Sequence, residues 1–288
     1  EVLLPPYHPD TPLVRQDYAR YYDEITRLDR FVGAVLQELE TQNVADDTIV
    51  IFLSDNGRPF PRDKTTLYDS GIRTPLIIRW PGTVKPASRC NQLVSSIDLA
   101  TTILSLAGLR AGPSYMGKDF TALLEGGNKG IRDTIFAEKN WHDYEDRSRA
   151  VRDRRYKYII NHYADLAGTP PADAARSDTF KEMQRLRAEG NLPALQSTCF
   201  TAPRPREELY DLSTDPYELR NIALDPAHQD TLERLRAEYR QWRINTGEKA
   251  PGLRTPDEFD RVTGTPTPAR IRPRWSKAKM IREGVLLP

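Results

Sequence analysis

Apolar residues recur at alternating steps of four and three along the first forty residues of the chain. They are Val14, Tyr18, Tyr21, Ile25, Leu28, Val32, Val35 and Leu39. This spacing places them on one face of a helix. Thr11 is a typical N-cap residue, and Pro12 suits the first helical position. The pattern therefore predicts an amphipathic helix from about Pro12 to Gln42.

Two later apolar runs do not follow the helical spacing. Residues 48–53 are rich in β-branched side chains and show no polar alternation, and residues 74–80 are similar. Such runs are typical of strands that are covered on both faces inside a parallel sheet. Ser96 is then placed to cap a helix that Gly108 would end. The order of strand, loop, strand and helix predicts an α/β sheet.

After about residue 130 the pattern changes to short runs with turn residues between them. Strands are expected at Thr134–Ala137, Ala150–Arg152 and Tyr156–Ile160, with a turn at residues 153–155 between the last two. This arrangement is typical of an antiparallel meander. The sequence therefore predicts that a smaller antiparallel-sheet α+β subdomain follows the α/β part along the chain.

The remaining residues alternate between irregular and helical character. Residues 163–206 are rich in Ala, Pro and Arg and predict an irregular insertion with a short helix near 178–189. Residues 225–243 predict a helix that packs through Leu232, Leu235, Tyr239 and Trp242. The predicted divisions are residues 1–130 for the α/β part, 131–245 for the subdomain, and 246–288 for a Pro-rich basic tail.

Composition narrows the classes of partner. The 288 residues carry a net charge of +1, are 38% hydrophobic and include 23 prolines. The near-zero charge indicates no nucleic-acid partner, and no stretch approaches the roughly 20 apolar residues of a membrane span. Cys90 and Cys199 have no second Cys or His at zinc-ligand spacing. Length alone is compatible with two domains.

Candidate chemistry follows the first predicted strand. Asp55 and Asn56 stand directly after the run 48–54, where a buried strand leaves its sheet and where oxygen ligands suit a hard cation. The following Gly57 also makes Asn-Gly a good hairpin turn. However, residues 58–64 contain prolines and charges where a hairpin needs a strand, so they indicate a shaped loop. That loop ends at Lys64, and the combination predicts chemistry on an anionic oxyacid ester.

An ordered series of motifs resembles the second half of a type I sulfatase, of the alkaline-phosphatase-like superfamily. The resemblance spans most of residues 10–245. Its motifs are Ser54-Asp55-Asn56-Gly57, Lys64, Leu67-Tyr68, Gly71-Ile72-Arg73-Thr74-Pro75, Trp80-Pro81-Gly82, Ser96-Ile97-Asp98-Leu99, Leu106-Ala107-Gly108, the run 208–216 and Asn221-Ile222-Ala223. The implied fold is a mixed α/β sheet with flanking helices, followed by the antiparallel subdomain.

The resemblance implies roles for three of these residues. Asp55 and Asn56 would be two ligands of one calcium ion whose remaining ligands lie outside this chain. Lys64 would contact the sulfate and its leaving oxygen, where it offsets growing negative charge. Taken without the resemblance, a solvated loop charge is the favoured interpretation of Lys64.

The family's nucleophile is not found in this sequence. It is a Cys or Ser in a Cys-X-Pro-X-Arg-like motif, oxidised to formylglycine, and neither Cys90 nor Cys199 stands in such a motif. We therefore expect the chain to be a carboxy-terminal portion that is inactive alone and whose partner is the missing amino-terminal sulfatase segment. An isolated portion is expected to expose an unpaired sheet edge and apolar surface, which favours poor solubility.

Within the family, residues 58–61 and Asp10-Thr11-Pro12 look most like heparan N-sulfatases (sulfamidases). This implies hydrolysis of sulfate esters or sulfamates on a sulfated saccharide such as N-sulfoglucosamine. His142 and Asp143 then become candidates for hydrogen bonds to the sugar, the alternative being a solvated loop. The resemblance also implies a periplasmic, extracellular or lysosomal location, and it leaves a homodimer open.

Two other functional classes stay open. One is a metal-dependent phosphatase or phosphodiesterase of the same superfamily, which generally needs two metals held by several Asp and His residues. The other is a non-catalytic pseudoenzyme or carbohydrate-binding module with the same fold. The metal that co-purifies would separate the first alternative from a sulfatase.

The remaining charged residues receive structural interpretations. His8, His162 and His228 have no ligand spacing, and Arg73 is expected to be a buried partner of Asp69. The tail attracts a polyanion or forms a solvated arm. Its charged and aromatic residues are Arg270, Arg272, Arg274, Trp275, Lys277, Lys279, Arg282 and Glu283.

Overall fold

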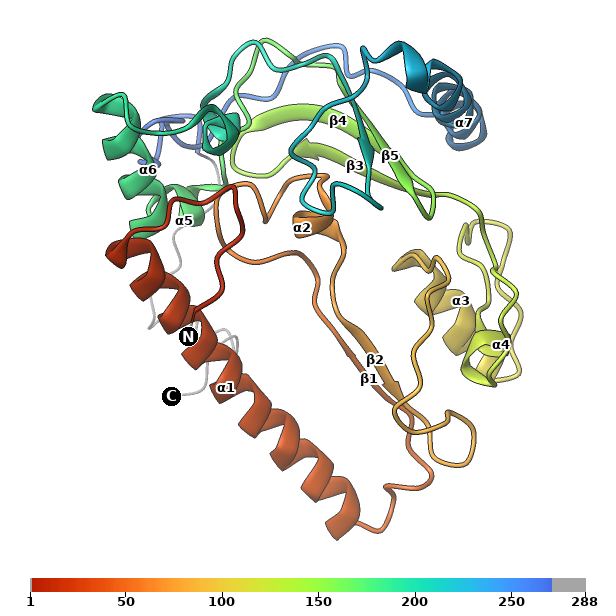
Figure 1. The fold of residues 1–288 in the computed structure, drawn as a ribbon. Helices are drawn as coiled ribbons and strands as arrows, with labels where there is room; N and C mark the ends of the chain where they lie inside the picture. The colour runs from red at the N-terminus through yellow and green to blue at the C-terminus, as the bar shows by residue number, and fades with distance from the viewer. Residues whose placement is uncertain (1, 271–288) are drawn as a thin grey trace.

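The first helix agrees closely with its prediction. The computed structural model describes residues 2–270, and its α1 runs over Pro12–Thr41. Thr11 Oγ1 accepts the N–H of Val14 at 3.4 Å, which caps the helix as expected. Only Val14 and Tyr18 of α1 are buried, and the ring of Tyr18 stacks on Phe60. Tyr21 also packs against Phe60, and the predicted apolar stripe from Ile25 onward extends away from the core (Figure 1).

The two apolar runs form a hairpin-like pair. β1 (Val50–Leu53) pairs with β2 (Leu76–Arg79) in antiparallel register, with Val50 opposite Arg79 and Leu53 opposite Leu76. The expectation of a parallel neighbour is wrong for this pair. Residues 54–75 hold only one short helix, α2 (Asp69–Ile72), and return the chain without the longer helical crossover typical of parallel strands. The expected cover on both faces is also not found, since Leu53, Leu76 and Ile77 are exposed.

Two further helices lie beside this pair. α3 (Ile97–Leu106) ends at Gly108, whose φ of 72° requires the left-handed conformation, as predicted. The Ser96 side chain makes no capping bond. The Asp98 carboxylate instead accepts the N–H groups of Ser95 and Lys118, both at 2.7 Å, and so joins α3 to the segment before α4 (Thr121–Leu124).

The second half of the chain forms a four-stranded antiparallel meander in the order β3-β4-β5-β6. Three strands confirm the predicted ones: β3 (Ile135–Trp141), β4 (Glu145–Arg152) and β5 (Tyr156–Asn161). The turn before β5 is also confirmed, since Asp153 Oδ1 accepts two backbone N–H groups there. β6 (Glu207–Asp211) lies in a segment for which the sequence pattern predicted no strand.

Helices and short turns surround the meander. The insertion contains α5 (Ala172–Ala175), α6 (Asp178–Ala188) and the 3₁₀ turns η1 (Ala194–Gln196) and η2 (Thr198–Phe200). A third turn, η3 (Pro226–His228), leads into α7 (Gln229–Thr246). As predicted, α7 packs on the sheet through Leu232, Leu235 and Tyr239, with Trp242 partly buried. Residues after α7 fold back, where Phe259 is buried and the N–H of Glu258 donates to the Asp143 carbonyl.

A buried cluster of charged side chains joins α2 to the meander. Lys157 on β5 is fully buried, with its Nζ 2.6 Å from Asp69 of α2 and 2.8 Å from Glu218. Arg152 on β4 also donates to both Asp69 carboxylate oxygens. A buried charge without a partner costs free energy of folding. This cluster therefore requires α2 and the meander to pack together.

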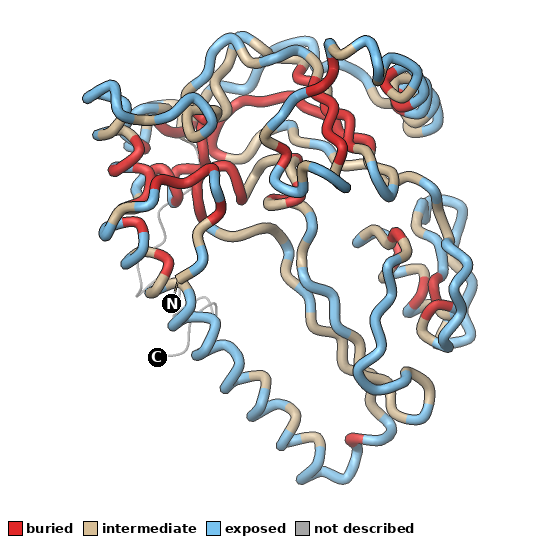
Figure 2. The backbone as a smooth tube through the Cα atoms, viewed as in Figure 1, coloured by how far each residue is buried: buried red, intermediate tan, exposed pale blue. Residues whose placement is uncertain are grey.

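Burial is uneven across the molecule. Figure 2 shows that buried residues gather in the meander and the loops against it, while the outer part of α1 and the β1–β2 pair are exposed or intermediate. The exposed apolar side chains there include Ile25, Leu28, Phe31, Val35, Leu53, Leu76 and Ile77. We call this set the apolar face. It confirms the expected exposed apolar surface. The tail cations after Arg270 lie outside the described residues.

Candidate functional site

The first part of the candidate site is the turn after β1. Ser54 Oγ donates to the Asn56 carbonyl at 2.7 Å, and the Gly57 N–H donates to the Gly71 carbonyl at 2.9 Å. Asn56 uses its amide N–H on the Gly57 carbonyl, so that its Oδ1 has no partner among residues 2–270. The exposed Asp55 carboxylate likewise makes no hydrogen bond or ion pair with the described residues. Two hard oxygen donors are thus available side by side.

Close backbone packing explains the glycines of this region. A Cβ at Gly57 would overlap the Ser70 carbonyl oxygen, and one at Gly71 would overlap the carbonyls of Asp63 and Thr66. The absence of both side chains lets the loop after β1 lie directly against α2. The Asn-Gly step is therefore required by packing and does not form a two-residue hairpin.

Residues 58–66 follow this turn and include Lys64. We call them the anchored loop. Asp63 at its centre is fully buried, accepts the Tyr7 hydroxyl at 2.7 Å and lies 2.9 Å from Arg58 Nε. Burial raises the pKa of Asp63 to about 6, although Arg58 and Tyr7 oppose that shift. His8 Nε2 donates to the Pro61 carbonyl at 2.7 Å, and burial lowers the pKa of His8 to about 3. The core interpretation of His8 is confirmed.

A second anchor is Arg62. Its guanidinium lies over the rings of Tyr7 and Tyr68 and donates to the carbonyls of Tyr217 and Glu218. The loop is thus held by residues from both ends of the chain. Since these contacts are buried, they fix the loop without regular secondary structure.

Lys64 stands between two residues with unusual backbone geometry. Arg62 and Thr65 both have φ of 67°, which is rare for residues other than glycine and most unfavourable for a β-branched one. Such strain persists only where surrounding contacts enforce it, and it is common at functional sites. The Lys64 N–H donates to the Arg58 carbonyl at 3.0 Å.

The Lys64 ammonium has a partner that the sequence pattern did not indicate. Its Nζ donates to Asp173 Oδ2 at 2.8 Å, across 109 residues of sequence. Burial tends to raise the pKa of Asp173, but the bonds from Lys64 and the Ala174 N–H, with the nearby charge of His142, leave it below its usual range. No local signal marks Asp173, because the pair depends on how the insertion folds back.

His142 and Asp143 lie at the end of β3 and after it. His142 Nδ1 is 3.0 Å from Asp143 Oδ2, and the same oxygen accepts the Ala172 N–H at 2.8 Å. Asp143 is buried, whereas His142 keeps about 40% of its side chain exposed. Asp143 is therefore a support for His142 and α5, and only His142 presents its ring outward.

An open cleft of about 1580 Å³ collects part of the predicted site. Asp55, Asn56 and His142 line it, together with Thr65 and Thr66 of the anchored loop. Lys64 and Asp143 are not among the described residues that line it. Each is next to a residue that does line it: Lys64 precedes Thr65 in the sequence, and Asp143 lies 3.0 Å from His142.

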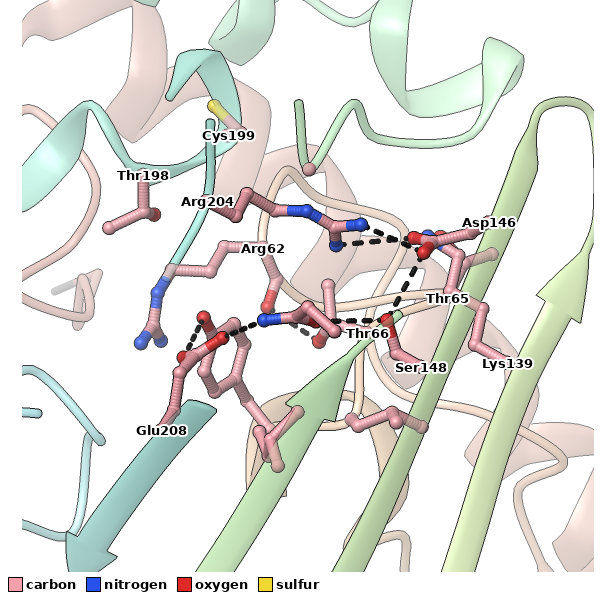
Figure 3. Close-up of a pocket in the computed structure, with 15 residues that line it drawn as sticks. Arg62, Thr65, Thr66, Lys139, Asp146, Ser148, Thr198, Cys199, Arg204 and Glu208 are labelled. Carbon is pink, nitrogen blue, oxygen red and sulfur yellow. Dashed lines mark hydrogen bonds and ion pairs between the residues drawn. The ribbon is translucent and has the colours of Figure 1, made fainter. Parts of the chain in front are cut away.

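A polar recess of about 50 Å³, shown in Figure 3, shares Thr65, Thr66 and Lys139 with the lining of the cleft. Arg204 donates to Asp146 at 2.8 Å, and Lys139 lies 3.0 Å from the same carboxylate. Although burial raises the pKa of Asp146, these two cations hold it well below its usual range. The hydrogen-bonded chain continues through Ser148, Asn161 and Glu208. The carboxylates of Asp146 and Glu208 in the recess are thus already paired.

One arginine differs from its prediction. Arg73 pairs with Asp69 at 3.8 Å as expected, but it is exposed, so its expected burial is wrong. Arg152 and Lys157 of the meander approach Asp69 more closely. Their strands bring them to α2 from positions far along the chain, which local spacing cannot indicate.

Other candidate groups are structural. Cys199 is buried, and burial raises the pKa of its thiol to about 12, which disfavours the thiolate. Within residues 2–270, no three His, Cys, Asp or Glu side chains gather to hold a metal ion by themselves. None of the helices in this part of the chain has the length and apolar character needed to cross a membrane.

Two family models match the sequence. The model described as Sulfatase matches residues 5–109, and the model described as N-sulphoglucosamine sulphohydrolase, C-terminal, matches residues 60–198. The matched segments include the turn after β1, the anchored loop and the insertion.

Curated relatives agree with these models. An ulvan-active sulfatase of Formosa agariphila is 40% identical over 249 residues, covering 86% of this chain and 41% of that protein. The N-sulphoglucosamine sulphohydrolase of Homo sapiens is 32% identical over 271 residues, covering 89% of this chain and 53% of that protein. The chain thus spans about half the length of these relatives.

A solved structure has the same fold. It is a protein in complex with its substrate D-glucosamine-2-N,6-O-disulfate, with a TM-score of 0.60 and 21% sequence identity. The match covers 79% of this chain and 40% of that chain.

Proposed function

The chain belongs to the sulfatase family, and from this premise we propose that it forms the carboxy-terminal part of a hydrolase of sulfate esters or sulfamates. The observation that carries the proposal is the pair Asp55 and Asn56. Both line the cleft, and both have oxygens that no described residue engages. Carboxylate and amide oxygens are what Ca²⁺ prefers.

These residues fit a calcium site in part. Asp55 and Asn56 would hold the ion from one side, and Ca²⁺ takes six to eight oxygen ligands, so the others would come from outside the described residues. A bound Ca²⁺ would neutralise negative charge on the sulfate group. Lys64 would add a second positive charge near the leaving atom, where charge grows as the bond breaks.

We also propose that the 288 residues alone do not turn over substrate. The sequence contains no Cys-X-Pro-X-Arg-like nucleophile motif, and the chain spans about half the length of its relatives. The proposed partner is the amino-terminal sulfatase segment, which would pack on the apolar face. An extended apolar surface of this kind is typical of a protein interface.

The proposed substrate is a sulfated saccharide such as N-sulfoglucosamine. The names of the human relative and of the solved complex refer to sulfated glucosamine, and the first relative is described as active on ulvan. His142, oriented by Asp143, is a candidate hydrogen-bond partner for the sugar or its amine. The family resemblance also implies a periplasmic, extracellular or lysosomal location.

Activity is tested on a protein that joins this chain to an amino-terminal sulfatase segment, with an aryl sulfate and N-sulfoglucosamine as substrates. We expect turnover that a calcium chelator abolishes, and a loss of about 10²–10³-fold in kcat for Lys64→Ala. Lys85→Ala is the matched control because Lys85 is an exposed loop lysine without a described ion pair. Equal activity of both variants would contradict the role of Lys64.

Calcium binding gives a second measurement. By isothermal titration, Asp55→Asn should weaken Ca²⁺ binding at least tenfold, since it removes a charged ligand. Asp46→Asn, which alters an exposed carboxylate before β1, should leave binding unchanged. Unaltered affinity in Asp55→Asn, or turnover of a phosphate ester in preference to both sulfates, would overturn the proposal.

A further inference from the structure

The contact between Lys64 and Asp173 joins two parts of the chain that are far apart in the sequence. Asp173 belongs to α5 in the insertion, and Lys64 belongs to the anchored loop. Their side chains meet at 2.8 Å, with about 21% of the Lys64 side chain and 49% of the Asp173 side chain exposed. The ammonium is thus held and also accessible.

The short helix α5 is rigidly placed. Ala172, Ala174 and Ala175 are all buried, and Ala172 packs with Tyr144 and Phe259. The Ala172 N–H donates to Asp143, and Arg176 donates to the Gly264 carbonyl at 3.0 Å. Asp173 Oδ1 accepts the Ala174 N–H at 2.9 Å, which fixes the carboxylate itself. The acceptor for Lys64 is therefore fixed before the lysine binds to it.

Lys64 has complementary constraints at its backbone. The buried contacts of the anchored loop fix its Cα, but its side chain has four rotatable bonds that would otherwise be free. A lysine ammonium has three donors. Among the described residues, Asp173 is the one acceptor that Lys64 Nζ contacts, so two donors remain for an anionic substrate.

We propose that Asp173 is a positioning residue that orders the Lys64 ammonium for its contact with the sulfate group, an inference that rests on the proposed function. The pair is half-exposed, and exposed ion pairs contribute little to stability. Its geometry instead restricts a flexible cation next to the cleft wall. The insertion would thereby act on the reaction through one carboxylate.

The kinetic test is a double-mutant cycle in the protein that joins this chain to an amino-terminal sulfatase segment. Asp173→Asn should lower kcat about tenfold or more with KM changed less than about threefold, because a misplaced charge acts mainly on the transition state. Combined with Lys64→Ala, it should cause no further loss. Asp173→Glu should recover part of the rate because it restores the charge.

Asp165→Asn is the matched control. Asp165 lies in the same insertion and makes an exposed ion pair with Arg254 at 2.8 Å, away from Lys64. It should leave kcat unchanged, and the melting temperature of either variant should shift by less than about 3 °C. An unaltered kcat in Asp173→Asn, or additive losses in the double variant, would overturn the proposal.

A measurement without turnover separates this inference from the proposed function. In nitrogen-15 NMR of lysine side chains, a hydrogen-bonded ammonium exchanges slowly enough to be seen, and Lys64→Arg assigns its signal. Asp173→Asn should remove that signal, whereas Asp165→Asn should not. If the unsubstituted protein that joins this chain to an amino-terminal sulfatase segment hydrolyses no sulfate, the proposed function fails. If the Lys64 signal is absent or indifferent to Asp173, this inference fails.

Discussion

Individual buried charges determine where the site residues lie. Asp63 has no solvent exposure and sits between the Tyr7 hydroxyl and the Arg58 guanidinium, one residue before Lys64. Its pKa of about 6 reflects burial that outweighs the arginine. The anchored loop therefore contains a carboxylate whose ionisation opposes folding.

The pH dependence follows from the direction of this shift. The pKa of Asp63 is about 6 when folded, against about 3.9 for an unfolded Asp, so the folded state binds the proton more tightly. Its contribution to stability is present below about pH 4 and is lost as pH rises through about 6. Asp63→Asn should remove that dependence.

Urea unfolding from pH 4 to 7 measures this effect. The free energy of unfolding of the wild type, relative to Asp63→Asn, should fall by about 1–3 kcal/mol over that range. Asp46→Asn should follow the wild type because Asp46 is exposed. Parallel curves for wild type and Asp63→Asn would show that the buried carboxylate does not titrate there.

At the scale of elements, the loop after β1 and α2 are joined through backbone contact without intervening side chains. Gly57 faces Ser70, and Gly71 faces Asp63 and Thr66. This contact places Asp55 and Asn56 at the cleft. The positions of Asp55 and Asn56 therefore depend on glycine at positions 57 and 71.

Two glycine substitutions should have opposite effects on stability. Gly57→Ala should lower the free energy of unfolding by about 1–3 kcal/mol, because its Cβ overlaps a carbonyl oxygen. Gly33→Ala, in the middle of α1 with open space around it, should raise stability by up to about 1 kcal/mol through helix propensity. Urea unfolding of both variants checks the signs, and equal signs would contradict the packing argument.

Elements with strong local signals could be predicted from the sequence. The Thr11-Pro12 start and the apolar spacing gave α1 to within one residue of its end, and short alternating runs gave β3, β4 and β5. β6 escaped prediction because its pairing with β5 forms across an insertion of more than forty residues.

The candidate site likewise contains residues that could be predicted from the sequence and one that could not. Asp55 and Asn56 were found because they follow a predicted strand, and His142 was a candidate through the family resemblance; all three line the cleft. Asp173 was missed because its pairing depends on tertiary folding. The predicted roles of Lys64 and Asp143 in catalysis and binding stay predictions.

At the scale of the molecule, the apolar face is the main departure from an ordinary folded surface. Phe31 on α1 is 64% exposed and Ile77 on β2 is 62% exposed. Their elements form the two long arms that extend below the meander in Figure 1. Large apolar side chains exposed along both arms favour association with another surface.

The isolated chain should therefore self-associate at micromolar concentration. Sedimentation velocity should show species larger than the monomer, and the double variant Phe31→Glu with Ile77→Lys should reduce them by adding charge to both arms. Leu224→Glu is the control, since Leu224 is 93% exposed and lies outside the apolar face. A wild-type chain that sediments as a monomer at high concentration would contradict this prediction.

The cluster of Lys157, Asp69 and Glu218 has a mechanical consequence. Its three charges come from β5, α2 and the segment after β6, and they meet where solvent is excluded. A break in the backbone between α4 and β3 would leave these charges in contact. The nicked halves should stay attached, because parting them would take Asp69 away from both Lys157 and Arg152.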